Sequence, residues 1–70
     1  MAKSLEKVHL KPGTYTGRWS GYFAVAVDPS DPDARITKND PNAFEVNEGV
    51  RGINCKCTIV VDDEGYARVN

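Results

Sequence analysis

The amino-acid sequence predicts an all-β protein: a small antiparallel barrel or sandwich, SH3-like or OB-like, with five or six strands and little or no helix. Three observations support this fold class. Apolar and polar residues alternate with a period of two over several short segments, as in half-buried strands. Glycine, proline, asparagine and aspartate separate these segments as turn residues do. No segment sustains the 3.6-residue period of an amphipathic helix.

The first two segments with strand character are residues 7–10 and residues 14–19. Residues 7–10 alternate, and they predict a short first strand. Pro12 followed by Gly13 is the signature of a type II turn. Residues 14–19 are rich in β-branched and aromatic side chains, which favour strands, and they predict the second strand.

A tight hairpin is expected next. Ser20-Gly21 predicts a two-residue loop, and residues 22–27 predict the returning third strand. This register places Trp19 opposite Tyr22. It also leaves apolar side chains on both faces of the hairpin, so both faces need cover, either by closure into a barrel or by another segment.

Residues 28–42 predict a long acidic loop. They contain three Asp-Pro steps. Each proline removes a backbone donor and biases the residue before it away from helix. At about 15 residues the loop is longer than most connections in a compact domain. Within it, residues 35–37 predict one brief strand.

The C-terminal part predicts three further strands, at residues 43–46, 52–61 and 66–69, the last two joined by an acidic turn. The strongest of these is the segment 52–61. Its alternation places five side chains on one face of the strand: Ile53, Cys55, Cys57, Ile59 and Val61.

Length and composition limit the functional classes. Seventy residues predict one small β domain over residues 1–70, with the 28–42 loop as its longest connection. A chain of this size buries only about 60% of the surface that it exposes when unfolded, which leaves little room for a deep catalytic pocket. Hydrophobic residues make up 40% and charged residues 27%, which excludes a disordered tail.

The charge is small overall but unevenly placed. The net charge of −1 lacks the basic excess of a typical binder of double-stranded nucleic acid. Residues 1–27 carry a net charge of +3, whereas residues 28–48 carry −4. This asymmetry predicts a mildly basic face and an acidic loop.

No segment has the apolar length of a transmembrane helix, and the N-terminal residues lack the pattern of a signal peptide. We therefore expect a cytoplasmic protein that does not associate with membranes. Its two cysteines are expected to be reduced thiols.

No catalytic or cofactor-binding pattern is recognisable, so we expect neither enzymatic activity nor a cofactor or metal ion. The one histidine, His9, has no serine or cysteine beside it in a nucleophile context. Cys55 and Cys57 supply two soft ligands, fewer than the four of a structural zinc site. Their common strand face predicts that both thiols pack in the core.

One short sequence segment resembles a segment of a known protein family. Residues 53–58, INCKCT, resemble the N-C-x-C-T run near the end of some phage minor head proteins. The resemblance covers six of the 70 residues, and no function is taken from it. The short, β-rich and nearly neutral chain is also typical of small phage-encoded or bacterial accessory proteins.

The strongest functional lead is an aromatic cluster that contains an arginine. Tryptophan, tyrosine and arginine are the residues most often found as hot spots of protein interfaces. We therefore predict a non-enzymatic binding module that contacts a protein partner, as an accessory protein acting on a host machine would. The predicted partner-binding residues are five from the cluster and three from the acidic loop: Tyr15, Arg18, Trp19, Tyr22, Phe23, Asp31, Asp33 and Arg35.

Two alternative functions stay open at this point. A single-stranded nucleic-acid binder of the OB or cold-shock type would place Lys7, Lys11 and Arg18 against phosphates while Trp19 and Phe23 stack on bases. A structural virion subunit would instead associate with copies of itself. The exposure of Trp19 shows whether the aromatic cluster is a contact surface or part of the core, because a buried Trp19 would place the cluster in the core.

Overall fold

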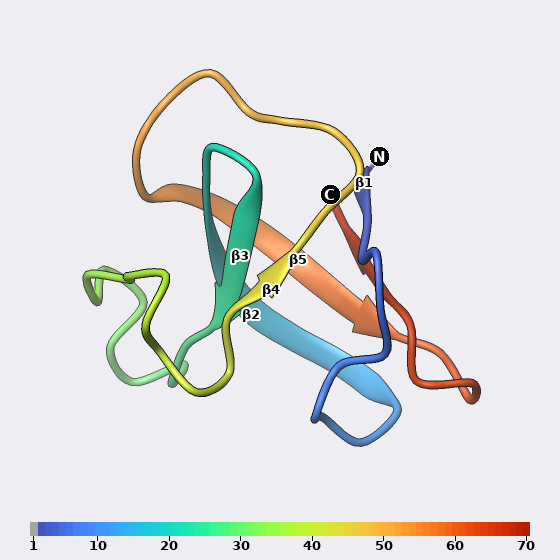
Figure 1. The fold of residues 1–70 in the computed structure, drawn as a ribbon. Coiled ribbons are helices and arrows are strands. Elements are labelled where there is room, and N and C mark those ends of the chain that lie inside the picture. The colour runs from blue at the N-terminus through green and yellow to red at the C-terminus, as the bar shows by residue number, and fades with distance from the viewer. Residues whose placement is uncertain (1) are drawn as a thin grey trace.

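The computed structural model describes residues 2–70, and within them it shows six strands and no helix. The strands are β1 (Ala2–Lys3), β2 (Gly13–Ser20), β3 (Phe23–Ala26), β4 (Phe44–Glu45), β5 (Cys55–Val61) and β6 (Ala67–Val69). They form one antiparallel sheet in the order β1-β6-β5-β2-β3-β4 (Figure 1). The predicted all-β class is confirmed. In residues 2–70 no helix has the length and hydrophobicity that crossing a membrane requires.

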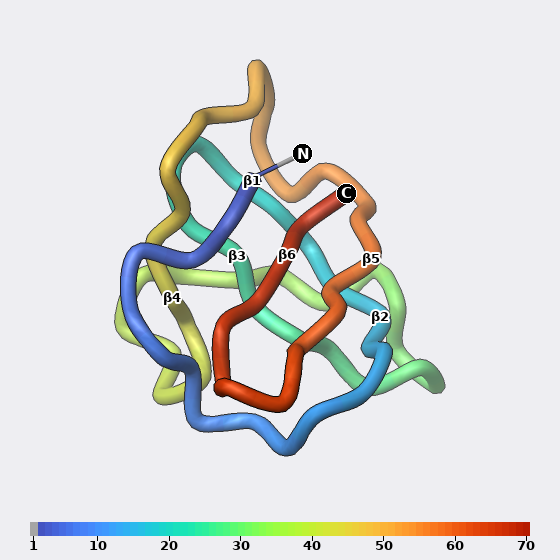
Figure 2. Tube along the Cα trace, turned by 90° about the vertical axis from the view of Figure 1, so that its right-hand side faces the viewer, coloured from blue at the N-terminus to red at the C-terminus, as the bar shows by residue number. Residues whose placement is uncertain are grey.

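The sheet curls into a small half-barrel whose outer strands meet at one place (Figure 2). Ser4, directly after β1, forms a bridge with Val46, directly after β4. The Asn47 N–H donates to the Lys3 carbonyl at 2.9 Å, and the Asn47 side chain accepts the Lys3 N–H at 2.9 Å. The Leu5 N–H also donates to the Glu45 carbonyl at 3.0 Å, so backbone groups of both outer strands are satisfied and little free edge remains there.

Small aliphatic side chains fill the interior of the barrel. Burial along β5 alternates from Cys55 to Val61, as the period of two predicted. The β2–β5 register places Tyr15 opposite Ile59, so both strands contribute to the same interior. The buried residues of this core are Ala2, Ala24, Val46, Ile59, Val61, Ala67 and Val69.

Gly17 lies at the centre of the β2–β5 pair, opposite Cys57. A Cβ atom at position 17 would lie 2.4 Å from Ile59 Cδ1, 2.8 Å from Ile59 Cγ1 and 3.1 Å from Cys57 Sγ. Separations below 3 Å are inside the contact distance of two carbon atoms. The missing side chain at Gly17 therefore creates the space that Ile59 fills.

The β2–β3 hairpin turns one residue later than predicted. The loop residues are Gly21 and Tyr22, not Ser20 and Gly21, and Trp19 pairs with Ala24 instead of Tyr22. Gly21 has a φ of 59°, the positive value that the first central residue of a type II′ turn requires. Because the pairing moves by two positions, the side chains of β2 and β3 keep the faces that the sequence predicted, whereas Tyr22 leaves the strand and lies exposed in the turn.

The predicted first strand at residues 7–10 is wrong. These residues form a loop, and the first strand of the sheet is β1. The Val8 N–H donates to the Gly65 carbonyl at 2.9 Å, which attaches the loop to the β5–β6 turn. Val8 and Leu10 pack against the core from this loop, so their alternation reflects burial and not strand pairing.

Two other predicted strand segments also differ. Residues 35–37 contain no strand. β5 begins at Cys55 and not at residue 52, because Asn54 has a φ of 55° and ends the extended backbone. Ile53, predicted to share the inner face of this strand, is consequently 82% exposed.

The acidic 28–42 loop covers part of the outer face of the hairpin. Val25 is buried although it lies outside the core of the barrel, and its cross-strand neighbour on that face is Arg18. Asp33 approaches Arg18 at 3.7 Å, and Ile36 is the one buried hydrophobic residue of the loop. Both faces of the hairpin are thus covered, as the sequence predicted: the inner face by the core and part of the outer face by the acidic loop.

The start of this loop is held by local hydrogen bonds. Asp28 Oδ1 accepts the Ser30 N–H at 2.9 Å and the Ser30 hydroxyl at 2.8 Å. These bonds favour the ionised carboxylate, so they lower the pKa of Asp28 from its ordinary value. The Asp-Pro sequence therefore forms a defined turn where the chain leaves β3.

Candidate functional site

The aromatic cluster predicted to contact a partner is divided between the core and the surface. Tyr15 and Trp19 face the barrel interior and pack against the core, each half-buried. The Trp19 indole N–H is buried and has no acceptor among residues 2–70. Arg18 and Phe23 lie on the outer face, and Tyr22 lies in the turn at the end of the hairpin. The five side chains do not form one continuous surface.

The three candidate residues from the acidic loop have different surroundings. Asp33 is 82% exposed and pairs with Arg18, whose side chain is only 13% exposed. Asp31 and Arg35 are exposed on the same loop. The Asp31 carbonyl accepts the Ala34 N–H at 3.2 Å and so forms a turn. The structure therefore brings Asp33 to the hairpin at Arg18 and leaves Asp31 and Arg35 in solvent.

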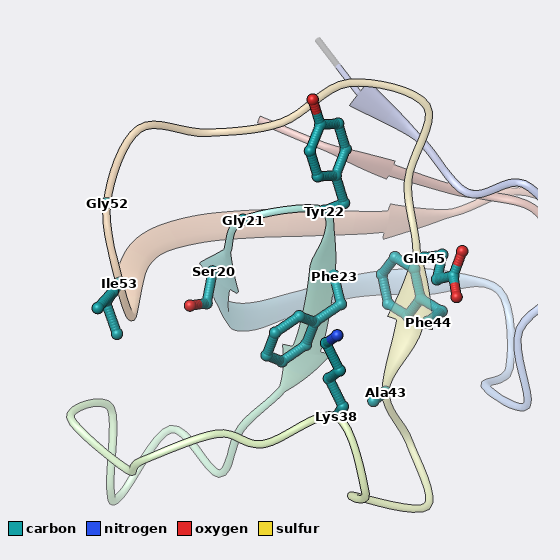
Figure 3. Close-up of a pocket in the computed structure, with 10 residues that line it drawn as sticks. All are labelled: Ser20, Gly21, Tyr22, Phe23, Lys38, Ala43, Phe44, Glu45, Gly52 and Ile53. Carbon is teal, nitrogen blue, oxygen red and sulfur yellow. The ribbon is translucent and has the colours of Figure 1, made fainter.

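A surface pocket of about 590 Å³ lies where the hairpin turn, β4 and the chain preceding β5 meet (Figure 3). Phe23 and Phe44 line it with aromatic rings, and Ile53 borders it from the segment before β5. We call it the Phe23–Phe44 pocket. The β3–β4 pairing sets Glu45 opposite Phe23 and Phe44 opposite Ala24, so the pocket lies at the outer strand of the sheet.

The rim of this pocket carries unusually exposed apolar side chains. Tyr22 is 68% exposed and Ile53 is 82% exposed. Among residues 2–70 the large hydrophobic residues that are exposed also include Leu5 and Val60, but neither of these lines the pocket. Exposed apolar side chains around a concave site are typical of a binding surface.

The hairpin turn at the rim is held in place by the segment that follows β4. The Val46 N–H donates to the Tyr22 carbonyl at 2.9 Å, and the Val50 N–H donates to the Gly21 carbonyl at 3.0 Å. A Cβ atom at Gly49 would lie 3.0 Å from Tyr22 Cζ, so the tyrosine ring rests against this glycine. The rim is therefore formed before any partner arrives.

Two opposite charges flank the rings. Lys38, from the acidic loop, and Glu45, from β4, both line the pocket. In Figure 3 the Phe44 ring lies between the Lys38 amine and the Glu45 carboxylate. An apolar surface with one cation and one anion suits an uncharged or mixed peptide segment better than a polyanion.

Sequence reasoning identified Tyr22 and Phe23 but missed Phe44, Ile53 and Lys38 at this pocket. A signal for Ile53 existed, because the turn-forming residues Gly52 and Asn54 flank it and interrupt strand pairing on both sides. No local signal distinguishes Phe44, since a phenylalanine in a short strand is most often a core residue.

Neither cysteine forms part of the pocket. Burial raises the pKa of the Cys57 thiol to about 11, while the nearby Arg18 charge lowers it and Cys55 raises it further. The thiol is consequently protonated at neutral pH and is a poor nucleophile or metal ligand. Within residues 2–70 no group of three or more His, Cys, Asp and Glu side chains is placed to hold a metal ion.

We expect the alkylation of Cys57 to require unusually alkaline solution. In a Cys55→Ser variant, reaction with iodoacetamide should be slow at pH 7 and should rise towards a midpoint near pH 11, measured by mass spectrometry. Because folding raises this pKa, the contribution of the thiol to stability is complete below pH 9 and is lost as the pH rises to about 11. The same protein in guanidinium chloride is the control. A folded-state midpoint at or below that of the unfolded chain would contradict the burial of Cys57.

No protein-family model matches the chain, and neither a curated protein nor a solved structure is similar to it.

Proposed function

We propose that the protein is a non-enzymatic module that binds a segment of another protein through the Phe23–Phe44 pocket. The observation that carries this proposal is the rim, where Tyr22 and Ile53, 68% and 82% exposed, border a concave site lined by two phenylalanine rings. A partner contributes a large apolar side chain to the pocket, and the rim residues become buried around it.

The energetics of such binding are favourable. Burying an exposed aliphatic or aromatic side chain contributes roughly 1.5–3 kcal/mol. The backbone hydrogen bonds from Val46 and Val50 fix the turn in advance, so ordering the rim costs little conformational entropy on binding. Lys38 and Glu45 supply polar contacts that orient the bound segment.

The geometry does not favour base stacking on the residues that the sequence suggested. Trp19 packs against the interior, and Phe23 lies on the opposite face of the hairpin beside the pocket. Lys7 lies near Gly65 in the loop before β2, away from this pocket. The role as a phage or bacterial accessory protein, the virion alternative and the cytoplasmic location stay predictions of the sequence.

Peptide selection tests the proposal directly. Peptides selected from a random displayed library against the folded protein should carry a large apolar residue, and their binding should perturb the amide resonances of Tyr22, Phe44 and Ile53. We expect Ile53→Ser to weaken the selected peptides about tenfold or more, since one anchor residue typically contributes at least 1–2 kcal/mol.

Leu5→Ser is the matched control. Leu5 is also exposed, at 56%, but it lies outside the pocket, so its replacement should leave peptide affinity unchanged. Equal weakening by both variants, or selected peptides that perturb only resonances elsewhere on the barrel, would refute the pocket as the binding site. A dimer that dissociates in Ile53→Ser, seen by light scattering, would identify a second copy of this chain as the partner.

A further inference from the structure

Strands β1, β6, β5 and β2 form one wall of the barrel (Figure 2). The register places the cationic residues of these strands on the outer face of the wall. The register places Lys3 opposite Arg68 and Arg18 opposite Lys56, so each pair shares a face. Lys3, Lys56 and Arg68 are exposed, whereas Arg18 is half-buried. None of these four strands contains an acidic residue. We call this surface the basic face.

Two directly opposed pairs of like charge reduce the stability of an antiparallel sheet. Only part of this cost is offset within the protein. Asp33 lies 3.7 Å from Arg18, and the Arg18 Nε atom is buried with no acceptor among residues 2–70. In the same part of the chain Lys56 has no carboxylate within ion-pair distance. An external anion would compensate the charge of the exposed Lys56 side chain.

Hydroxyl groups and an aromatic ring accompany the cations. Thr16 and Thr58 lie opposite each other, two residues along each strand from the Arg18–Lys56 pair and therefore on the same face. Together with Lys56 they line a shallow depression of about 330 Å³. At the other cation pair, Lys3 Nζ lies 5.1 Å from the centre of the Tyr66 ring. Lysine, threonine and tyrosine side chains are typical donors to phosphate oxygens.

The spacing of the two cation pairs indicates an extended ligand. Arg68 pairs with Val60, which is four residues from Lys56 along β5. At roughly 3.4 Å per residue, the pairs are about 14 Å apart along the strand. A single phosphate ion cannot contact both. The pattern therefore fits a chain of phosphates.

We propose that the basic face binds the phosphate backbone of single-stranded nucleic acid. The face is convex, on a molecule whose extents are only 27 × 26 × 21 Å, so a flexible strand can follow it. A duplex, with a persistence length of about 50 nm, touches such a surface only locally. Acidic residues border the face at Asp33, which pairs with Arg18, and at the Asp62–Glu64 turn, which joins β5 to β6. This proposal goes beyond the peptide site and uses a different surface.

The residues of the basic face share only Arg18 with the nucleic-acid residues that the sequence suggested. Those were Lys7, Lys11, Arg18, Trp19 and Phe23. Here the contacts are electrostatic and depend on Lys3, Lys56 and Arg68, which strand pairing brings together from the two ends of the chain.

Fluorescence anisotropy of a labelled oligothymidylate, measured over a range of salt concentrations, tests the proposal. Each phosphate neutralised on a single strand contributes about −0.7 to the slope of log K against log salt, so three exposed cations predict a slope of about −2. The Lys56→Gln/Arg68→Gln variant should lose about 1.4 of this slope. Arg35→Gln/Arg51→Gln removes the same charge from exposed loops and should keep the full slope.

Binding that is absent at low salt, or that is reduced equally in both double variants, would overturn the proposal. Polyglutamate that competes as well as the oligonucleotide would show an acidic protein as the better ligand, and a duplex that binds more tightly would exclude the single strand. Peptide binding and oligonucleotide binding can be tested separately, because they use different residues. Ile53→Ser should keep oligonucleotide binding, and Lys56→Gln/Arg68→Gln should keep peptide binding.

Discussion

Replacing Gly17 with alanine is expected to lower the free energy of unfolding by about 1–3 kcal/mol, the usual cost of overpacking a core. The new Cβ atom would lie 2.4 Å from Ile59 Cδ1, and Ile59 is fully buried, so its side chain has no free space to enter. A domain of about 70 residues is stabilised by only a few kcal/mol, so this loss is a large share of the total. Urea denaturation, followed by circular dichroism, measures it.

A double-mutant cycle identifies the contact responsible. Ile59→Val removes the Cδ1 atom and should by itself cost about 0.5–1.5 kcal/mol. In the Ile59→Val background, Gly17→Ala should cost clearly less than in the wild-type protein, because the closest clash is gone. Additivity within about 0.5 kcal/mol would show that the two residues do not interact.

Gly49→Ala is a matched control for the same substitution. A Cβ atom there would also meet a side chain closely, 3.0 Å from Tyr22 Cζ. Tyr22 is 68% exposed, however, so its ring can move into solvent. We expect a change in stability within about 0.5 kcal/mol. A loss as large as that of Gly17→Ala would mean that the turn, and not the barrel interior, limits stability.

The second large effect is expected for Ser4→Ala, at about 1–3 kcal/mol. Ser4 is 4% exposed, and its hydroxyl accepts the Ala67 N–H at 2.9 Å in a buried position. The Ser4 N–H donates in turn to the Ala67 carbonyl at 2.8 Å. Removing the hydroxyl leaves a buried backbone donor without an acceptor, and the cost is that of its desolvation.

Amide hydrogen exchange gives a local readout for this variant. The Ala67 amide should lose protection in Ser4→Ala by more than the change in global stability accounts for. Ser20→Ala is the control, since Ser20 is a half-buried strand residue whose side chain forms no hydrogen bond within residues 2–70. If Ser20→Ala and Ser4→Ala destabilise the protein equally, the hydrogen bond from the Ala67 N–H to the Ser4 hydroxyl does not contribute to stability.

Some of the fold is readable from local patterns. The alternation of Cys55, Cys57, Ile59 and Val61 predicted the inner face of β5, because side chains on any strand alternate. The exact position of the hairpin turn could not be predicted. Gly21, with a positive φ, suits either central position of a two-residue turn, so Ser20-Gly21 and Gly21-Tyr22 were both compatible with the sequence. β1 was missed because two residues are too few to show a period.

The candidate sites were less predictable than the fold. Sequence proximity grouped Tyr15 with Tyr22, yet Tyr15 packs against the core from β2, whereas Tyr22 lies exposed in the hairpin turn. The pocket instead joins Phe23 to Phe44 and Ile53, which are distant in sequence and meet only through the β3–β4 pairing and the loop before β5. The basic face likewise depends on pairing partners that no local pattern reveals.

The pairing of β1 with β6 also constrains the order in which the protein folds during its synthesis. Ala2 can pair with Val69 only after the residues between them have been made, and the contacts of Ser4 need both Val46 and Ala67. Contacts so distant along a chain form slowly, because a large loop must close before they stabilise it. During synthesis on the ribosome, Ala2 and Lys3 therefore stay unpaired until β6 has emerged.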